Sequence, residues 1–380
     1  MRIAYITKYD SSDLHQWSGA GFYILNALRN SGLQTIPIGN LRDKYDRITR
    51  EKTKFYKRFF SKKYRKDREP LLLKFYAYQV EKNLSSTDCD AVFSPGTIPI
   101  AYLRTTKPLI FWTDATFAGM IDFYPDFTNL CGETIRDGNR MEQLALSKCR
   151  LAIYSSEWAA NTAINNYDVN PAKVKVVPFG ANIECDRDEK EIHKIISSKR
   201  AETCKLLFIG VDWIRKGGDI SIKAAELLNQ RGIKTELDIV GCNPPGEVPG
   251  FVKVHGFVSK KTKEGRNLLD KLLKESHFLI LPSRAECSGI VFAEASSFGL
   301  PSLSTRVGGI PTTIHDGRNG QTFPLQAGPE KYCDFIEGLM SSKKEYDQLA
   351  ISSFREYSER LNWQSSGRSV YELIQEFCGE

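Results

Sequence analysis

The sequence predicts an α/β protein made of two Rossmann-like units, each with a doubly wound parallel sheet. Short apolar runs alternate with stretches of helical spacing through the first half of the chain, and the alternation restarts after about residue 204. Strands that alternate with helices favour a parallel sheet covered by helices on both faces. The 380 residues are enough for two domains with separate cores.

The first half of the chain is predicted to contain six strands and four helices. The strands are residues 3–7, 35–38, 91–94, 109–113, 151–155 and 174–178, and the helices are residues 20–31, 70–84, 132–148 and 157–166. A charged stretch from Ile183 to Ala201 then breaks the pattern and offers few apolar side chains to bury. We interpret this stretch as a linker.

The second half repeats the pattern. We predict strands at 206–210, 235–240, 252–255, 278–281 and 302–305, and helices at 216–230, 263–274, 290–299, 329–341, 343–360 and 363–377. The expected domains are residues 1–185 and 186–362, with a terminal helix at 363–380 that crosses back to the first domain. Because ligands of such sheets bind at the carboxyl ends of strands and at domain interfaces, we expect a cleft between the two domains to hold the site.

Composition excludes several classes of site and segment. The nine cysteines form no Cys-x-x-Cys pair and the five histidines show no metal-ligand spacing, so we expect neither a metal site nor a disulfide framework. No apolar run approaches the roughly 18 residues of a membrane span. The N-terminal residues supply one short strand without a signal-peptide core, so we expect a cytoplasmic protein.

The densest chemical signal lies at residues 281–295, where a strand is followed by a loop and a helix. Glu286 stands in the loop and Glu294 in the helix, and the N–H groups of Ser288, Gly289 and Ile290 would point outward at the helix start. Such a start attracts anions, and a carboxylate can accept two protons from a vicinal diol. This combination suits a nucleotide-sugar. The alternative is that the two acids are ordinary capping and surface residues.

A second signal is the adjacent pair Arg215 and Lys216, which follows a strand ending at Gly210. Two cations at the carboxyl end of a strand can neutralise a diphosphate. The alternative is a solvated pair in the first turn of a helix. Two further turns, Val307-Gly308-Gly309 and His315-Asp316-Gly317, follow the last predicted strand.

In the first half, a glycine loop and one acid follow predicted strands. Gly19 and Gly21 lie in the sequence Trp17-Ser18-Gly19-Ala20-Gly21, which opens a helix, and Asp114 follows the strand at 109–113. We expect Asp114 to line a sugar or acceptor pocket. The alternative is an aspartate that caps a helix or turn.

The order of these motifs resembles the retaining glycosyltransferase family 4, whose members have the GT-B fold. Gly-x-Asp-Trp-x-x-Lys-Gly-Gly at 210–218 is followed by His-Gly-Phe at 255–257 and Leu-Pro-Ser-x-x-Glu at 281–286. Gly-x-x-x-x-Glu-Ala at 289–295, Val-Gly-Gly-x-Pro at 307–311 and His-Asp-Gly-x-Asn-Gly at 315–320 complete the set. The resemblance covers residues 204–375 well and residues 1–182 loosely.

The resemblance implies a role for each matched residue. Arg215 and Lys216 would hold the donor diphosphate, Glu294 the ribose hydroxyls, and Glu286 the transferred sugar. The backbone of Ser288, Gly289 and Ile290 would lie beside that sugar, and the backbone from Gly256 to Val258 would edge the nucleobase. Gly19 and Gly21 match the family's first glycine loop, and Asp114 stands where many members have a histidine. Ser288 and Thr312 depart from residue types common in the family.

The resemblance therefore implies a retaining hexosyltransferase that needs no metal and no cofactor. It would use a UDP- or GDP-sugar and a hydroxyl acceptor such as a glycan, a glycolipid or a small polyol. The alternatives are a nucleotide-sugar epimerase or a phosphorylase on the same architecture, or a non-catalytic subunit that binds sugar nucleotides. A phosphorylase would require a pyridoxal cofactor and usually a longer chain.

The net charge of +7 is concentrated in one segment that carries +9, while the rest of the chain sums to −2. Residues 42–68 hold 13 Lys and Arg but 4 Asp and Glu, and apolar residues recur at Ile48, Phe55 and Phe59. On a helix these apolar residues would form a stripe beside a cationic face, which suits an anionic membrane and a lipid-linked acceptor. The alternative is a solvated helix that packs its stripe on the domain. We expect no nucleic acid partner, because no binding motif accompanies the patch.

Overall fold

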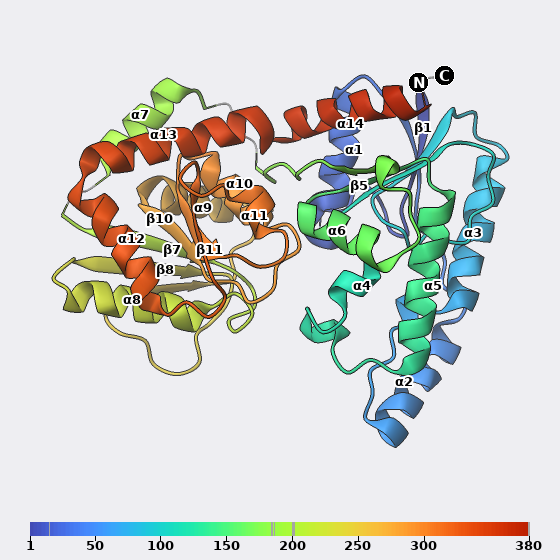
Figure 1. Ribbon diagram of the computed structural model, residues 1–380, viewed down its shortest axis with the longest axis horizontal. Helices are drawn as coiled ribbons and strands as arrows, with labels where there is room; N and C mark the ends of the chain where they lie inside the picture. The colour runs from blue at the N-terminus through green and yellow to red at the C-terminus, as the bar shows by residue number, and fades with distance from the viewer. Residues whose placement is uncertain (15, 184, 186, 200–201, 379–380) are drawn as a thin grey trace. The chain divides into compact units, whose positions relative to one another are not determined.

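The computed structural model describes residues 1–14, 16–183, 185, 187–199 and 202–378. It divides the chain into two compact units (Figure 1). The first unit joins Met1–Phe179 to Trp363–Glu380, and the second is Gly180–Asn362. Residues 180–183 and 185, which we had assigned to the first domain, thus fall in the second unit.

The first unit contains a six-stranded parallel sheet in the order β2-β1-β3-β4-β5-β6. Its strands are β1 (Arg2–Ile6), β2 (Gln34–Ile38), β3 (Ala91–Ser94), β4 (Leu109–Thr113), β5 (Leu151–Tyr154) and β6 (Val174–Val176). Its helices are α1 (Ala20–Asn30), α2 (Asp46–Phe60), α3 (Pro70–Leu84), α4 (Phe117–Met120), α5 (Gly132–Lys148), α6 (Glu157–Asn166) and α14 (Trp363–Cys378). The central strands are buried on both faces, which explains their unbroken apolar runs.

The second unit contains another six-stranded parallel sheet, in the order β12-β11-β10-β7-β8-β9. Its strands are β7 (Cys204–Ile209), β8 (Thr235–Val240), β9 (Val252–Gly256), β10 (Phe278–Leu281), β11 (Ser302–Thr305) and β12 (Gly320–Phe323). Its helices are α7 (Glu189–Ser198), α8 (Gly218–Gln230), α9 (Lys263–Glu275), α10 (Ile290–Ser296), α11 (Ile310–Thr313), α12 (Pro329–Ser341) and α13 (Lys343–Arg360). The prediction of two Rossmann-like parallel-sheet units is confirmed, and a cleft between them stays a prediction.

The terminal helix α14 belongs to the first unit and packs along α1 (Figure 1). A Cβ on Gly367 would lie 2.7 Å from the carbonyl oxygen of Ala27, so only glycine allows this close approach of the two helices. Trp363, where α14 begins, stacks on Tyr23 at 5.9 Å and also contacts Phe179 and Trp112. The chain leaves the first unit after Phe179 and re-enters it at Trp363, so the two ends of this segment are in contact through their rings.

Our interpretation of residues 183–201 as a linker was wrong for most of the stretch. Its described part forms α7, which buries Ile192, Ile195 and Ile196 in the core of the second unit. Asp188 caps this helix by accepting a hydrogen bond from the amide of Glu191 at 2.9 Å. The three isoleucines recur at helical spacing, but we gave more weight to the many charged residues around them. Residues 184, 186, 200 and 201 of the stretch lie outside the described residues.

None of the described helices is both long and apolar enough to cross a bilayer.

Candidate functional site

Two loops at the carboxyl ends of neighbouring strands, β7 and β10, lie against each other in the second unit. Gly217 has a φ of +75°, and a Cβ there would lie 2.1 Å from the carbonyl oxygen of Pro282. The amide of Arg284 donates a hydrogen bond to the carbonyl oxygen of Arg215 at 2.6 Å. The glycine therefore lets the Arg-Lys motif approach the loop that carries Glu286.

Arg215, Lys216 and Glu286 form a charged cluster in which both cations face one carboxylate oxygen. Lys216 Nζ donates a hydrogen bond to Glu286 Oε2, and Arg215 Nη1 lies 3.6 Å from the same oxygen. The side chains of Lys216 and Glu286 are 10% and 12% exposed. Burial alone would raise the pKa of Glu286, but the charges of Lys216 and Arg215 hold that pKa below its ordinary value. Glu286 is therefore an anion paired with cations at neutral pH.

Backbone groups fix the loop around Glu286. Gly289, with a φ of +72°, begins α10, and its N–H helps to hold the pKa of the Glu286 carboxyl down. The amide of Gly309 donates to the carbonyl oxygen of Glu286 at 2.9 Å, and Thr313 Oγ1 donates to that of Ser288 at 2.7 Å. The Val-Gly-Gly motif thus belongs to the same site. The Gly289 N–H supports Glu286 here, and the predicted place of this backbone beside a ligand stays a prediction.

Glu294 lies in α10 with its side chain 6% exposed. Lys260 Nζ donates a hydrogen bond to Glu294 Oε1 from the loop that follows β9. Sequence reasoning missed Lys260, although a cation two residues after the predicted Gly256–Val258 segment is the kind of signal used for Arg215. The pair adds a second carboxylate and cation to those at the carboxyl ends of β7 and β10.

Three glycines bring the carboxyl ends of β7, β8 and β9 together. A Cβ on Gly210 would lie 2.9 Å from Lys216 Cγ, and a Cβ on Gly241 would lie 2.6 Å from the carbonyl oxygen of Gly210. The amide of Gly241 donates to the carbonyl oxygen of Gly256 at 2.7 Å. Val258 packs against the core just beyond. The predicted residues Gly210 and Gly256 are therefore connected through Gly241, which the sequence did not single out.

The remaining predicted residues, Gly19, Gly21 and Asp114, lie in the first unit. Gly19 has a φ of +83° and begins α1, and a Cβ on Gly21 would lie 2.3 Å from Tyr9 Oη. Asp114 follows β4, and its Oδ2 accepts a hydrogen bond from Trp17 Nε1 at 3.3 Å. The glycine loop after β1 and the acid after β4 therefore meet within this unit, through a tryptophan that sequence reasoning did not assign.

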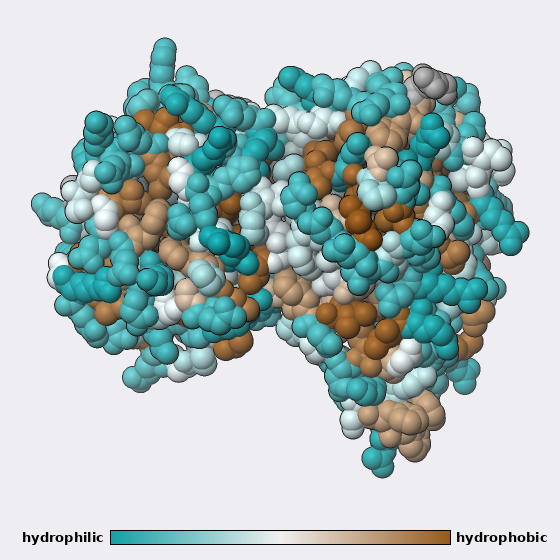
Figure 2. Space-filling model, in the orientation of Figure 1, coloured by the Kyte–Doolittle hydropathy of each residue, from teal (hydrophilic) through white to brown (hydrophobic). Residues whose placement is uncertain are grey.

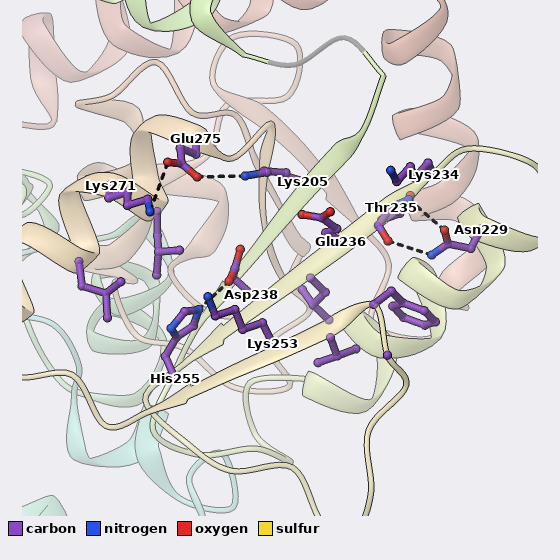
Figure 3. Close-up of a pocket in the computed structure, with 16 residues that line it drawn as sticks. Lys205, Asn229, Lys234, Thr235, Glu236, Asp238, Lys253, His255, Lys271 and Glu275 are labelled. Carbon is purple, nitrogen blue, oxygen red and sulfur yellow. Dashed lines mark hydrogen bonds and ion pairs between the residues drawn. The ribbon is translucent and has the colours of Figure 1, made fainter.

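The structure also contains a cavity of about 620 Å³ on one face of β7, β8 and β9 in the second unit (Figure 3). His255 and Asp238 are hydrogen-bonded at 2.6 Å in its wall, and Lys205 pairs with Glu275 at 3.0 Å. The connection from β8 to β9 contains no helix in its described residues, 241–251, so this face stays open. Arg215, Lys216, Glu286 and Glu294 do not line the cavity. The cavity is thus separate from the charged cluster, and the cluster, which holds the motif residues, remains the candidate site.

Among the described residues, no group of three or more His, Cys, Asp or Glu is arranged to hold a metal ion.

Comparison with known proteins shows what the second unit resembles. Residues 203–342 match the family model of glycosyl transferases group 1, which confirms the group 1 resemblance for this part of the chain. D-inositol 3-phosphate glycosyltransferase of Corynebacterium diphtheriae is 20% identical over 244 residues, covering 60% of this chain and 56% of that protein. Lipopolysaccharide glucosyltransferase WaaG of Escherichia coli is 31% identical over 164 residues, covering 41% of this chain and 43% of that protein. The chain thus spans about half the length of the curated relatives it matches.

Solved structures extend the similarity of fold to the whole chain. Anabaena HepE in complex with UDP has a TM-score of 0.67 at 14% identity, with 99% of this chain and 100% of that chain covered. The same protein has also been solved with UDP-glucose, at a TM-score of 0.63. At this identity the likeness concerns the fold of the chain.

Proposed function

We propose that this chain transfers a hexosyl unit from a UDP- or GDP-sugar to a hydroxyl acceptor, because residues 203–342 match the family model of glycosyl transferases group 1. The observation that carries the proposal is the buried cluster of Arg215, Lys216 and Glu286 at the carboxyl ends of β7 and β10. A cationic pair at this position suits a diphosphate, because positive charge in a poorly solvated site stabilises the charge that develops on a leaving group. HepE, which shares the fold, binds UDP and UDP-glucose.

In the proposed reaction each group of the site has one task. Arg215 and Lys216 bind the diphosphate, Glu286 binds hydroxyls of the transferred sugar, and Glu294 binds the ribose. The bond from the anomeric carbon to the diphosphate breaks while the acceptor oxygen bonds to the same face of the sugar. Because the acceptor attacks the face from which the diphosphate leaves, the anomeric configuration is retained without a protein nucleophile, and the departing phosphate takes the acceptor's proton. The two cations supply the charge that a metal ion provides in other transferases, so we propose a metal-independent reaction without a cofactor.

A thermal-shift panel of UDP, GDP, ADP and their sugars tests the donor site. We expect one nucleotide series to raise the melting temperature of the wild type, since a ligand that binds only the folded state stabilises it. Lys216→Ala should lose this shift. Lys205→Ala is the matched control, because Lys205 lies in β7 of the same sheet and pairs with Glu275 instead. Equal shifts in both variants would reject the assigned diphosphate site.

Product analysis separates the proposed transferase from its alternatives. A hexosyltransferase releases the nucleoside diphosphate in the presence of an acceptor, and slowly in its absence. An epimerase would return a nucleotide-sugar with an inverted hydroxyl, and a binding subunit would return the donor unchanged. Either of these results would reject glycosyl transfer.

We further propose that α2 binds an anionic membrane surface and brings the first unit to a lipid-linked or membrane-bound glycan acceptor. Its apolar stripe is exposed: Ile48, Phe55, Phe59 and Phe60 are 46%, 50%, 70% and 57% exposed. Figure 2 shows hydrophobic side chains gathered beside hydrophilic ones at the end of the first unit where α2 lies. Exposed phenylalanines next to a cationic face suit the interface of an anionic bilayer.

The other side of α2 is anchored to its own unit. Lys52 Nζ lies 2.6 Å from Glu69 Oε2 and 2.7 Å from Glu133 Oε1, and Tyr56 Oη donates to Glu133 Oε2 at 2.8 Å. Tyr56 also stacks on Tyr64 at 5.8 Å. The helix therefore packs through Lys52 and Tyr56, and these contacts leave Phe55 and Phe59 exposed.

Vesicle sedimentation tests the membrane proposal. We expect the wild type to bind vesicles that contain phosphatidylserine at low salt, and to bind pure phosphatidylcholine vesicles far less. Neutralising Lys57, Arg58, Lys62 and Lys63 should weaken binding at least about tenfold, given roughly 1 kcal/mol per cation near the surface. Neutralising Lys190, Lys194, Lys223 and Lys234 in the second unit is the control. No binding by the wild type, or an equal loss in the control, would reject the proposal.

A further inference from the structure

Three consecutive residues before α1 have left-handed backbone conformations. The φ values of Trp17, Ser18 and Gly19 are +49°, +54° and +83°. Glycine adopts this conformation readily, but a tryptophan and a serine pay about 1–2 kcal/mol each. Such strain persists where surrounding contacts hold it, and it often marks a functional segment.

The strained turn delivers the Trp17 indole to the carboxyl end of β4. Its Nε1 donates to Asp114 Oδ2 at 3.3 Å, across 97 positions of the chain. The ring also makes an edge contact with Phe179, with centroids 5.5 Å apart and planes at 85°. An indole held on one side by Phe179 and bonded to Asp114 through its nitrogen has little rotational freedom.

Tyr9 provides a second neutral group near Asp114. Its pKa is raised to about 12, first by burial and then by the negative charge of Asp114, so the phenol stays protonated at neutral pH. Gly21 leaves room for this phenol, because a Cβ there would lie 2.3 Å from Tyr9 Oη. The glycine loop therefore carries a tryptophan that donates to the carboxylate, and it leaves room for a neutral tyrosine whose hydroxyl has no hydrogen-bond partner among the described residues.

We propose that Trp17 is a positioning residue whose indole N–H fixes the Asp114 carboxylate for contact with a hydroxyl group of the acceptor. The inference rests on the proposed function, since Asp114 has this task only in glycosyl transfer. An indole is a donor that carries no charge, so it orients the carboxylate and preserves its negative charge. A carboxylate held in this way can accept a hydrogen bond from an acceptor hydroxyl group. The left-handed turn is the backbone path that brings the indole there.

A double-mutant cycle in steady-state kinetics tests the inference. Trp17→Phe keeps an aromatic ring against Phe179 and removes the N–H, so we expect kcat to fall about tenfold with little change in the donor KM. In an Asp114→Ala background the same substitution should have almost no further effect, because its target is gone. Trp158→Phe is the matched control, since Trp158 contacts Phe123 at 4.8 Å on another element of this unit. Equal effects of Trp17→Phe in the two backgrounds would overturn the inference.

The indole resonance gives a readout that does not depend on turnover. The chain has five tryptophans, so ¹⁵N-tryptophan labelling yields few indole signals, and the signal lost in Trp17→Phe identifies Trp17. We expect this signal to shift in Asp114→Ala, because the acceptor of its hydrogen bond is removed. An indole signal insensitive to Asp114 would overturn the inference even if transfer is found. A shift with no transfer activity in the wild type would instead reject the proposed function and leave the Trp17–Asp114 contact standing.

Discussion

The two units differ in the partners of the acidic side chains that lie near the carboxyl ends of their strands. Both have a six-stranded parallel sheet, and both place acidic side chains at or near the carboxyl ends of strands. In the second unit these acids meet cations: Glu286 pairs with Lys216 and Arg215, and Glu294 pairs with Lys260. In the first unit Asp114 accepts a hydrogen bond from the neutral indole of Trp17, and Glu142 accepts one from the Thr97 hydroxyl at 2.9 Å, with the charge of Arg68 also acting on Glu142.

The backbone at the two sets of strand ends differs as well. Gly217 and Gly289 supply the left-handed positions of the second unit at no steric cost, whereas Trp17 and Ser18 occupy such positions in the first unit. A charged cluster requires close approach of loops, which glycine permits. A tryptophan in a left-handed turn is tolerated where its side chain has a task. This difference agrees with a second unit that binds a diphosphate and a first unit that orients uncharged hydroxyl groups.

The largest effect is expected for Lys216→Ala, which removes the ion pair between Lys216 and Glu286 in the second unit. We expect transfer to fall by at least about 100-fold, because one electrostatic contact to the leaving group is lost. The free energy of unfolding should also fall by about 3 kcal/mol, because Glu286 loses its closest cation in a buried site. Turnover assays and chemical denaturation measure the two effects.

Glu294→Ala keeps the Lys216–Glu286 pair and therefore serves as its companion. We expect the donor KM to rise, so that most transfer is lost at ordinary donor concentrations. The pair of Lys216 and Glu286 should remain intact. Wild-type turnover in either variant would contradict the assignment of the donor site.

The next effect concerns Glu142 in α5 of the first unit, which accepts a hydrogen bond from an uncharged hydroxyl group. Burial raises the pKa of Glu142 from 4.5 to about 7, and Oε1 has no hydrogen-bond partner among the described residues. The folded state therefore holds a proton that the unfolded chain has released, so the free energy of unfolding should decrease as the pH rises from about 4.5 to about 7. Glu142→Gln removes this dependence and should be more stable than the wild type at pH 8, by up to about 3 kcal/mol.

Denaturant unfolding at pH 5 and pH 8 checks this prediction. Glu264→Gln, at an exposed position in α9, is the control and should change neither value. The free energy of unfolding could instead change by the same amount between pH 5 and pH 8 in the wild type and in Glu142→Gln. That result would show that Glu142 is already charged in the folded state at pH 5.

The smallest effect is expected for Ser18→Gly, which gives the first unit the glycine that the second unit uses at its left-handed positions. Relief of the strained φ should raise the free energy of unfolding by about 1 kcal/mol. Ser85→Gly, at a residue in the right-handed helical region after α3, should leave stability unchanged or lower it. Thermal melts of the two variants measure the difference, and a loss of stability in Ser18→Gly would show that the serine side chain outweighs the strain.

Local pattern was sufficient for most strands and for the motif loops. The apolar runs of β4 and β10 are buried on both faces, and this burial is what makes such runs visible in a sequence. The short strand β12 was missed because its four residues, Gly320–Phe323, have no apolar run and form a strand only through pairing with β11. Helix α7 was missed because seven charged residues between Glu184 and Glu191 masked the spacing of Ile192, Ile195 and Ile196.

Periodicity and spacing along the chain were enough to predict the two α/β units, the order of motifs and the residue types at the strand ends. The pairing of side chains emerged when the chain was seen folded. Lys216 reaches Glu286 across 70 positions, Lys260 reaches Glu294 across 34, and Trp17 reaches Asp114 across 97. Such pairs depend on the order of strands in the sheet and on loop paths opened by particular glycines, and neither is written in the local pattern of residues.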